Sequence, residues 1–265
     1  MTNTSLLAGP PPSAGPESFA DHSRRLGPRP WGSRGLIDTL DRAGLVGRGG
    51  ASFPVATKWR SVAARRGPAV VIANGAEGEP LSRKDQTLMA LRPHLVIDGA
   101  MLAAESVGAN RVLLYVGEAH SSALKAMARA LAERPPAEAG RATLLPAPPS
   151  YVAGEETAAV QFVNAGVAAP TAIPPRPFER GVDGRPTLVQ NVESLAHVAA
   201  IARRGDVWFR SLGRDGASGT VLLTVSGSGG RAASRAPTAT RTARMHTKSR
   251  AIIHADQASV PVPKL

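Results

Sequence analysis

Residues 47–85 read GRGGASFPVATKWRSVAARRGPAVVIANGAEGEPLSRKD, and this stretch decides the fold class. Its apolar run Ala69–Ala73 is short and continuous, which is typical of a strand buried on both faces of a parallel sheet. Helical spacing of apolar residues precedes the run over Phe53–Arg66, and a glycine loop precedes that helix. The stretch therefore predicts a loop, a helix, a strand and a second loop.

The chain on either side continues this alternation of helices and strands. Helices are predicted over Leu36–Leu45, Pro93–Gly108, Ser121–Arg134, Glu155–Asn164 and Asn191–Arg204, and strands over Arg111–Val116, Ala142–Leu145 and Thr220–Val225. This order indicates an α/β fold, a Rossmann-like parallel sheet flanked by helices. Ligands of such sheets bind at the carboxyl ends of the strands.

Composition divides the chain into three parts. Residues 1–35 form a leader rich in Pro and Gly, residues 36–227 form the α/β domain, and residues 228–265 form a basic tail. The tail holds five Arg and two Lys against Asp256, so its net charge is 7 − 1 = +6. Both terminal segments lack apolar periodicity, and we expect them to be disordered.

Charge and cysteine content exclude several classes of function. The net charge is +12, but aromatic residues make up only 4% of the chain and do not interleave with the arginines, so no nucleic-acid partner is expected. No cysteine is present, so this chain cannot ligate an iron–sulfur cluster, and its six His show no metal-ligand spacing. Without a membrane-length apolar run or a signal segment, a cytoplasmic location is expected.

Two loops carry candidate binding groups. Glycines at 47, 49 and 50 let the backbone approach a bulky ligand, and the free N–H groups of the following helix favour a phosphate. Such a loop on its own is equally consistent with an ordinary turn. The loop after Ala69–Ala73 adds the amide of Asn74 and the carboxylates of Glu77 and Glu79, which also fit a solvated acidic turn.

Two further clusters lie at predicted helix starts. Tyr151–Thr157, YVAGEET, pairs two acids, which either line a site or serve as ordinary N-terminal capping charge. Pro186–Ser194, PTLVQNVES, offers amide and hydroxyl groups. Neither cluster is specific alone.

Together the four clusters resemble the NADH-binding flavoprotein subunit of complex I and its relatives in NAD-linked hydrogenases and formate dehydrogenases. The resemblance covers about Leu36–Val225. The motifs that carry it are GRGGASFPVATKW, NGAEGEP followed by Lys84-Asp85, YVAGEET and PTLVQNVES, then Arg203-Arg204-Gly205, Trp208-Phe209 and Gly213-Arg214. It implies that residues 36–227 bind FMN and NADH. Hydride would pass from NADH to FMN, and electrons onward to a quinone or to iron–sulfur subunits of a larger complex, which would supply any peripheral membrane association.

The same resemblance implies the site residues. Gly47, Gly49 and Gly50 would form the flavin loop, Lys58 would face the phosphate or ring, Asn74 the ring edge, and Gln190, Asn191 and Ser194 would close the FMN site. Phe53 would stack on adenine, with Arg48, Glu79, Tyr151 and Glu156 on the nicotinamide side and Glu155 near the flavin. Glu77, Gly154 and Val189 complete the expected set. No side-chain nucleophile is needed, because the cofactor performs the covalent chemistry.

Several positions differ from the sequence pattern of the family. Ser52 replaces a glycine, Ala76 an aspartate and Ala153 a cysteine, and Gln190 stands where small or amide residues are usual. Loss of the aspartate would cost roughly 1–3 kcal/mol if its partner stays buried and unpaired. The family continues into a β-grasp region and a four-cysteine bundle, neither recognisable here, so we expect truncation, with the reading frame or gene departing near Gly227. The alternative function is a non-catalytic remnant or interaction protein with weak or lost cofactor binding.

Overall fold

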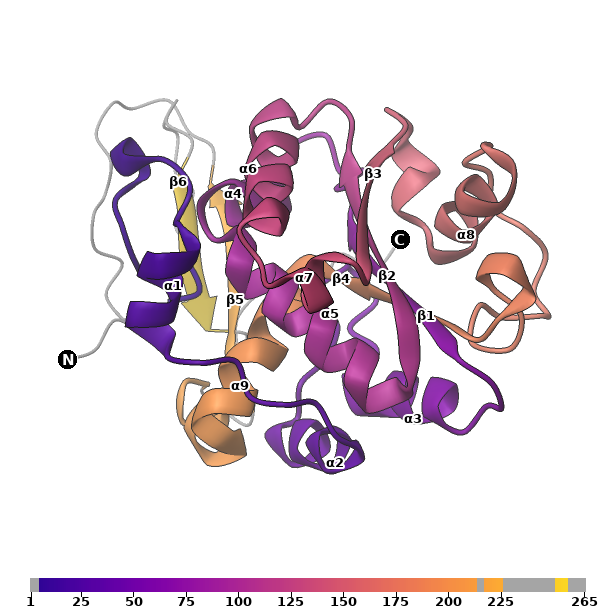
Figure 1. Cartoon of the computed structure of the whole chain (residues 1–265), viewed down its shortest axis with the longest axis horizontal. Helices are drawn as coiled ribbons and strands as arrows, with labels where there is room; N and C mark the ends of the chain where they lie inside the picture. Colours follow the sequence, from indigo (N-terminus) through magenta and orange to yellow (C-terminus); the bar gives the residue numbers. More distant parts are fainter. Residues whose placement is uncertain (1–4, 214–216, 226–250, 257–265) are drawn as a thin grey trace.

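Four parallel strands form the central sheet of the protein (Figure 1). A computed structural model describes residues 5–213, 217–225 and 251–256. The strands β1 (Ala69–Gly75), β2 (Ala109–Gly117), β3 (Ala142–Ala147) and β4 (Thr187–Asn191) lie in the order β3-β2-β1-β4. All three pairings are parallel, which confirms the predicted α/β class.

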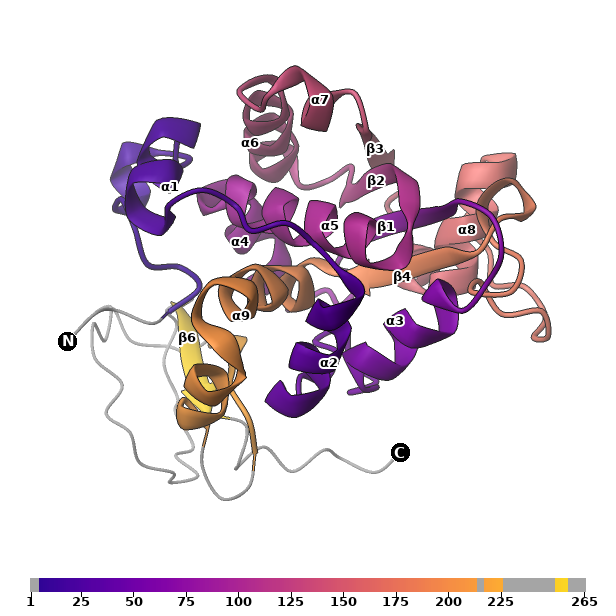
Figure 2. The same cartoon turned by 60° about the horizontal axis from the view of Figure 1, so that its bottom comes forward.

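Helices cover both faces of this sheet. They are α1 (Phe19–Leu26), α2 (Arg34–Ala43), α3 (Val55–Ala63), α4 (Lys84–Leu91), α5 (Pro93–Val107), α6 (Ser121–Ala132), α7 (Pro136–Ala139), α8 (Glu156–Ala165) and α9 (Val192–Ser211). Short 3-10 turns are η1 (Pro12–Ala14), η2 (Tyr151–Gly154) and η3 (Val182–Gly184). Figures 1 and 2 show α8 on one face and α5 on the other. No helix among the described residues is long and apolar enough to cross a bilayer.

Alternate side chains of β1 enter two hydrophobic cores. Val71 and Ala73 pack in the larger core with α3, α5 and α9, whereas Val70 and Ile72 pack in the smaller core with α8. Burial on both faces explains the continuous apolar run in the sequence. Of the residues in β1 only Asn74 is partly exposed, and it lies at the carboxyl end.

The order of the strands creates a switch point between β1 and β4. From β1 the chain passes through α4 and α5 to β2, whereas β4 pairs with the opposite side of β1. Ligands of open α/β sheets favour the carboxyl ends of two strands related in this way. A ligand site is therefore expected at the carboxyl ends of β1 and β4.

The expectation that residues 1–35 lack regular structure is wrong for Phe19–Leu26. That segment is α1, whose N-cap Ser18 accepts a hydrogen bond from the Asp21 amide. Its first amide, at Phe19, also donates to Glu133 at 2.8 Å, and His22 is buried. Tertiary contacts therefore override the Pro- and Gly-rich composition around this helix.

Other elements also differ from the sequence-based expectations, among them α4, β4 and β6. The sequence predicts neither α4 nor β4, a short strand in which polar Gln190 and Asn191 follow three less polar residues. Pro93 begins α5, and the residue before it, Arg92, is non-helical, so α4 and α5 remain separate. In the tail that we expect to be disordered, Ala251–Asp256 forms β6, antiparallel to β5 (Thr220–Val225). Residues 228–250 and 257–265 lie outside the described residues.

A buried carboxylate on α5 anchors the N-terminal segment. Asp98 accepts hydrogen bonds from His22 Nε2 at 2.9 Å and from the guanidinium groups of Arg134 and Arg203. Burial would raise the pKa of Asp98, but the hydrogen bond from His22 and the charges of the two arginines outweigh it and hold that pKa well below its usual range. Asp98 thus joins α1, α5, α9 and the turn after α6.

We expect Asp98→Ala to lower the free energy of unfolding by about 3–5 kcal/mol, because it removes the carboxylate that faces buried Arg203 and one of the two carboxylates that face Arg134 and His22. Urea denaturation followed by circular dichroism measures this change. As a control, Asp38→Ala removes an exposed partner of Arg60 and should leave the midpoint unchanged. Equal midpoints for both variants would contradict the anchoring role of Asp98.

Candidate functional site

Asn74 and Asn191 lie side by side where β1 and β4 end. The side-chain amide of Asn74 donates to the Gly154 carbonyl at 2.7 Å, and its carbonyl oxygen accepts from the Ala76 amide at 3.3 Å. The Asn74 carboxamide therefore links the loop after β1 to the end of η2. The structure brings the second and third predicted clusters together at this edge.

The predicted glycine loop lies over the start of α9. An isolated bridge between Val46 and Pro54 closes its base. A side chain built at Gly49 would lie 3.4 Å from Cβ of Asn191, and the Arg48 amide donates to Ser194 Oγ at 2.9 Å. The loop and the fourth cluster are therefore in direct contact.

The tip of this loop has amides available to a ligand. Within the described part of the chain, the N–H groups of Gly49, Gly50 and Ala51 donate to no backbone carbonyl. Gly50 has φ +107°, a conformation that favours glycine, and Ser52 has φ +49°. Exposed amides on a tightly turned backbone are suited to bind an anion.

Close backbone packing joins the β1 loop to η2. A Cβ built at Gly78 would lie 2.2 Å from the Tyr151 carbonyl oxygen, a distance that no side chain can occupy. A Cβ built at Gly154 would lie 3.8 Å from the Ala76 side chain. Gly78 is therefore required for the contact between these two loops.

An ion pair joins α3 to α8 beside the same edge. Lys58 Nζ lies 2.6 Å from Glu156 Oε2, and both side chains are about one quarter exposed, at 28% and 27%. Behind them, the indole of Trp59 donates to Gln190 Oε1 at 3.3 Å. Lys58 and Arg48 are the two positively charged residues in the predicted site. Lys58 is thus already paired with Glu156, another predicted site residue.

Two predicted carboxylates cap helices. Glu155 accepts from the amides of Thr157 and Ala158 at the start of α8. Glu77 accepts from Ser82 Oγ and from the amides of Asp85 and Gln86 at the start of α4. The capping alternative is therefore observed for Glu155, and any contact of these two side chains with a cofactor stays a prediction.

The remaining predicted residues divide between the surface and the core. Phe53 and Tyr151 are 52% and 71% exposed, and Glu79 is exposed as well. Val189 is buried in the core beneath α8. Aromatic faces are thus available on the loops, whereas Val189 could meet a ligand only through its backbone.

A buried charge network that the sequence does not predict lies beneath the site. Lys84 Nζ lies 2.8 Å from Asp85 Oδ1 and 3.0 Å from Glu193 Oε2. Burial would raise the pKa of Glu193, but His197, whose Nε2 lies 3.8 Å from Glu193 Oε1, and the charge of Lys84 lower it to about 2. The Lys84-Asp85 pair is visible in the sequence, but its position against Glu193 requires the tertiary structure.

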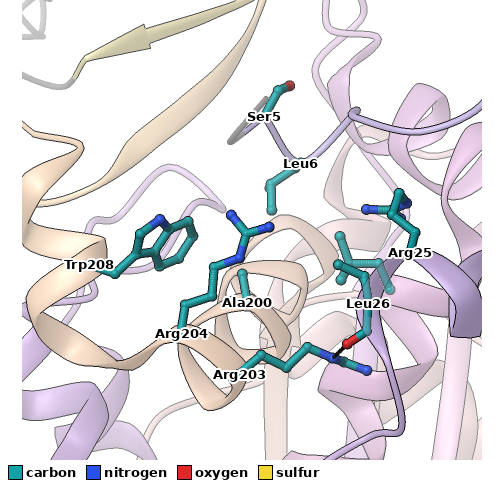
Figure 3. A pocket seen from close by; sticks show the side chains of 9 residues that line it. Ser5, Leu6, Arg25, Leu26, Ala200, Arg203, Arg204 and Trp208 are labelled. Carbon is teal, nitrogen blue, oxygen red and sulfur yellow. Dashed lines mark hydrogen bonds between the residues drawn. The ribbon is translucent and has the colours of Figure 1, made fainter. Parts of the chain in front are cut away.

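A separate pocket lies between the N-terminal residues, the end of α1 and α9 (Figure 3). Arg25, Arg203 and Arg204 line it, and the first two are paired with buried carboxylates. Arg204 stacks over Trp208 at 4.8 Å from the ring centroid. The pocket includes none of the predicted site residues.

Comparison with known proteins identifies the family. The model of a family described as the Nuo51 FMN-binding domain matches residues 40–200. The chain belongs to this family. The matched range contains all the predicted site residues and the whole parallel sheet, so the resemblance predicted from the four clusters is confirmed.

Curated relatives of this Nuo51-family chain are named as NADH-quinone oxidoreductase subunits. An NADH-quinone oxidoreductase subunit of Rickettsia bellii is 34% identical over 209 residues, covering 74% of this chain and 50% of the relative. The equivalent NADH-quinone oxidoreductase subunit of Aquifex aeolicus is 32% identical over 203 residues, covering 72% and 48%. The chain therefore spans about half the length of the curated relatives it matches.

A solved structure shows the same fold. An NAD+-reducing [NiFe]-hydrogenase in the air-oxidised state superposes with a TM-score of 0.67 and 38% sequence identity. The match covers 74% of this chain and 35% of the hydrogenase chain. The α/β domain therefore has a counterpart within a longer chain of this hydrogenase.

We expect Gly78→Ala to destabilise the protein by about 1–3 kcal/mol, because the new methyl group must displace the Tyr151 backbone. Thermal unfolding measures the loss. Gly35→Ala is the matched control, since its Cβ would meet only Ser33 Oγ at 3.6 Å on α2, and it should be neutral or slightly stabilising. A Gly78→Ala protein as stable as the Gly35→Ala protein would contradict the close loop contact.

Proposed function

We propose that this chain is the FMN- and NADH-binding module of an NADH:acceptor oxidoreductase. The observation that carries the proposal is the glycine loop, whose open amides at Gly49, Gly50 and Ala51 stand over the first turn of α9 at the switch point. Membership of a family described by FMN binding supports it. Relatives named as NADH-quinone oxidoreductase subunits support the choice of NADH.

The residues at the switch point fit a flavin mononucleotide. Its phosphate requires N–H donors and positive charge, which the loop amides and Lys58 can supply. Its ring requires a flat surface with polar edges, and the half-buried carboxamide of Asn74 lies where such an edge would be met. Gly49 leaves space above Asn191 that a side chain would fill.

The dinucleotide is assigned to the exposed side of the same loops. Phe53 and Tyr151 offer aromatic faces for stacking, and Glu79 offers an acceptor for ribose hydroxyl or amide groups. Glu156 would exchange part of its pairing with Lys58 for a ligand contact. These roles follow the family pattern residue by residue.

Bound FMN would supply the hydride-accepting chemistry, and the protein would supply orientation and electrostatics. The loop amides and Lys58 would hold the phosphate, and Asn74 would fix one ring edge. Phe53 would stack on the adenine, and Tyr151 would keep the nicotinamide group on the exposed side of the loops. No side chain has to act as a nucleophile or a general base.

The acceptor lies outside this chain. No cysteine is available to hold an iron–sulfur cluster here. Electrons would therefore pass to iron–sulfur partner subunits or to a quinone, in a cytoplasmic complex whose contact with the membrane comes through those partners.

The test is a visible spectrum of purified protein reconstituted with FMN. We expect a bound flavin spectrum that bleaches on addition of NADH under anaerobic conditions. Lys58→Gln should weaken FMN binding by about tenfold through loss of one charge-assisted contact. Lys125→Gln, at an exposed position on α6, is the control and should bind FMN as the unchanged chain does.

A folded protein that stays colourless with FMN would contradict this function. That result would favour the alternative of a non-catalytic remnant or interaction protein. Protein that binds FMN but is not bleached by NADH would contradict the dinucleotide assignment alone.

A further inference from the structure

Asp85 on α4 is a buried carboxylate held between two donors at the candidate site. Its side chain is 5% exposed, its Oδ1 lies 2.8 Å from Lys84 Nζ, and its Oδ2 accepts from Asn191 Nδ2 at 2.8 Å. Both oxygens are therefore occupied by N–H donors. The ionised carboxylate is the form that this geometry satisfies.

Asn191, the partner of Asp85, supports the floor beneath the glycine loop. Its Oδ1 accepts from the amides of Glu193 and Ser194, which caps α9, and its Cβ faces Gly49. With Oδ1 and Nδ2 both engaged, the Asn191 carboxamide has one defined orientation. The two helix amides hold Oδ1, and Asp85, whose carboxylate can only accept, holds Nδ2, so Asp85 secures the other end of the same carboxamide.

The backbone of Asp85 is tied to the second loop of the site. Its amide donates to Glu77 Oε1 at 2.9 Å, and Glu77 lies in the loop after β1. One residue therefore contacts the β1 loop through its amide and the β4–α9 corner through its carboxylate. These are the two segments that meet at the switch point.

We propose that Asp85 is a positioning residue for the flavin pocket, which orients Asn191 and thereby fixes the start of α9 beneath the glycine loop. This inference rests on the proposed function of FMN binding. It adds a residue that touches no ligand and acts only through Asn191. Lys84 keeps Asp85 in place and is itself held by Glu193.

The charges around Asp85 make this positioning pH-dependent. Burial raises the pKa of Asp85 to about 6; Glu77 and Glu193 add to the rise, and Lys84 opposes it. Among the described residues, further titratable or charged groups next to these are Arg48 and His197 beside Glu193, His120 beside Glu77, and Arg83 beside His120. Protonation of Asp85 turns one of its two acceptor oxygens into a hydroxyl group, which weakens one of the two contacts as pH falls through about 6.

Folding stability responds to Asp85 in the opposite direction from flavin affinity. Because its pKa in the folded protein lies above the usual value of 3.8, ionisation of Asp85 costs stability as pH rises from about 4 to about 6. The same ionisation strengthens both contacts, with Asn191 and with Lys84. A purely structural residue would move stability and affinity together.

The experiment measures FMN dissociation constants by flavin fluorescence quenching at pH 8 and pH 5. Three proteins are compared, namely the unchanged chain, Asp85→Asn and the surface control Asp38→Asn. We expect Asp85→Asn to bind about tenfold more weakly at pH 8, and the difference to disappear at pH 5. Ionisation of the FMN phosphate affects all three proteins equally, so their ratio isolates Asp85.

A second measurement needs neither FMN nor a variant. In the flavin-free protein, the side-chain NH2 resonances of Asn191 should titrate with a midpoint near pH 6 in nitrogen–proton correlation spectra, as the pKa of about 6 for Asp85 requires. If none of the three proteins binds FMN but the Asn191 resonances still titrate, the proposed FMN-binding function is wrong. The contact between Asp85 and Asn191 is then still supported. Resonances that do not move between pH 5 and pH 8, or equal loss of affinity at both pH values, would overturn the positioning role.

Discussion

The parallel pairing of β1 with β4 is the contact on which the rest of the structure depends. It sets Asn74 beside Asn191, although the helices α4 to α8 and the strands β2 and β3 separate these residues along the chain. Each strand then delivers its following loop or helix to the same point. The glycine loop before α3 can close over this point only because α9 starts there, so the geometry of the site follows from one strand pairing.

Polar side chains at this edge mainly fix the backbone. Asn191, Glu155 and Glu77 each accept two or more hydrogen bonds from helix amides or loop donors. Buried or partly buried polar atoms require such partners. The amides of the glycine loop are thereby left as donors for a ligand, because the carboxylates nearby are committed elsewhere.

Much of the fold could be predicted from the sequence, and its limits have physical causes. The continuous run Ala69–Ala73 indicates a buried strand because both its faces pack against helices. β4 could not be recognised, because five residues with two polar amides resemble a helix start. α1 is not predicted because its local signal is one cap residue, Ser18, while further support comes from the contacts of His22 with Asp98 and of the Phe19 amide with Glu133. For the site, short motifs locate the loops, but partners distant in sequence, such as Asp85 and Asn191, could not be paired.

Two buried aspartates illustrate why such pairings decide behaviour. Asp98 meets one histidine and two arginines, and their hydrogen bonds and charges hold its pKa far below the usual range. Asp85 is also buried but meets only one cation, and two carboxylates lie near it, so its pKa rises to about 6. The first carboxylate stays ionised and acts as a permanent anchor, whereas the second changes charge in a mildly acidic range. Their difference lies in the neighbours that the tertiary fold supplies, not in the residue type or its depth of burial.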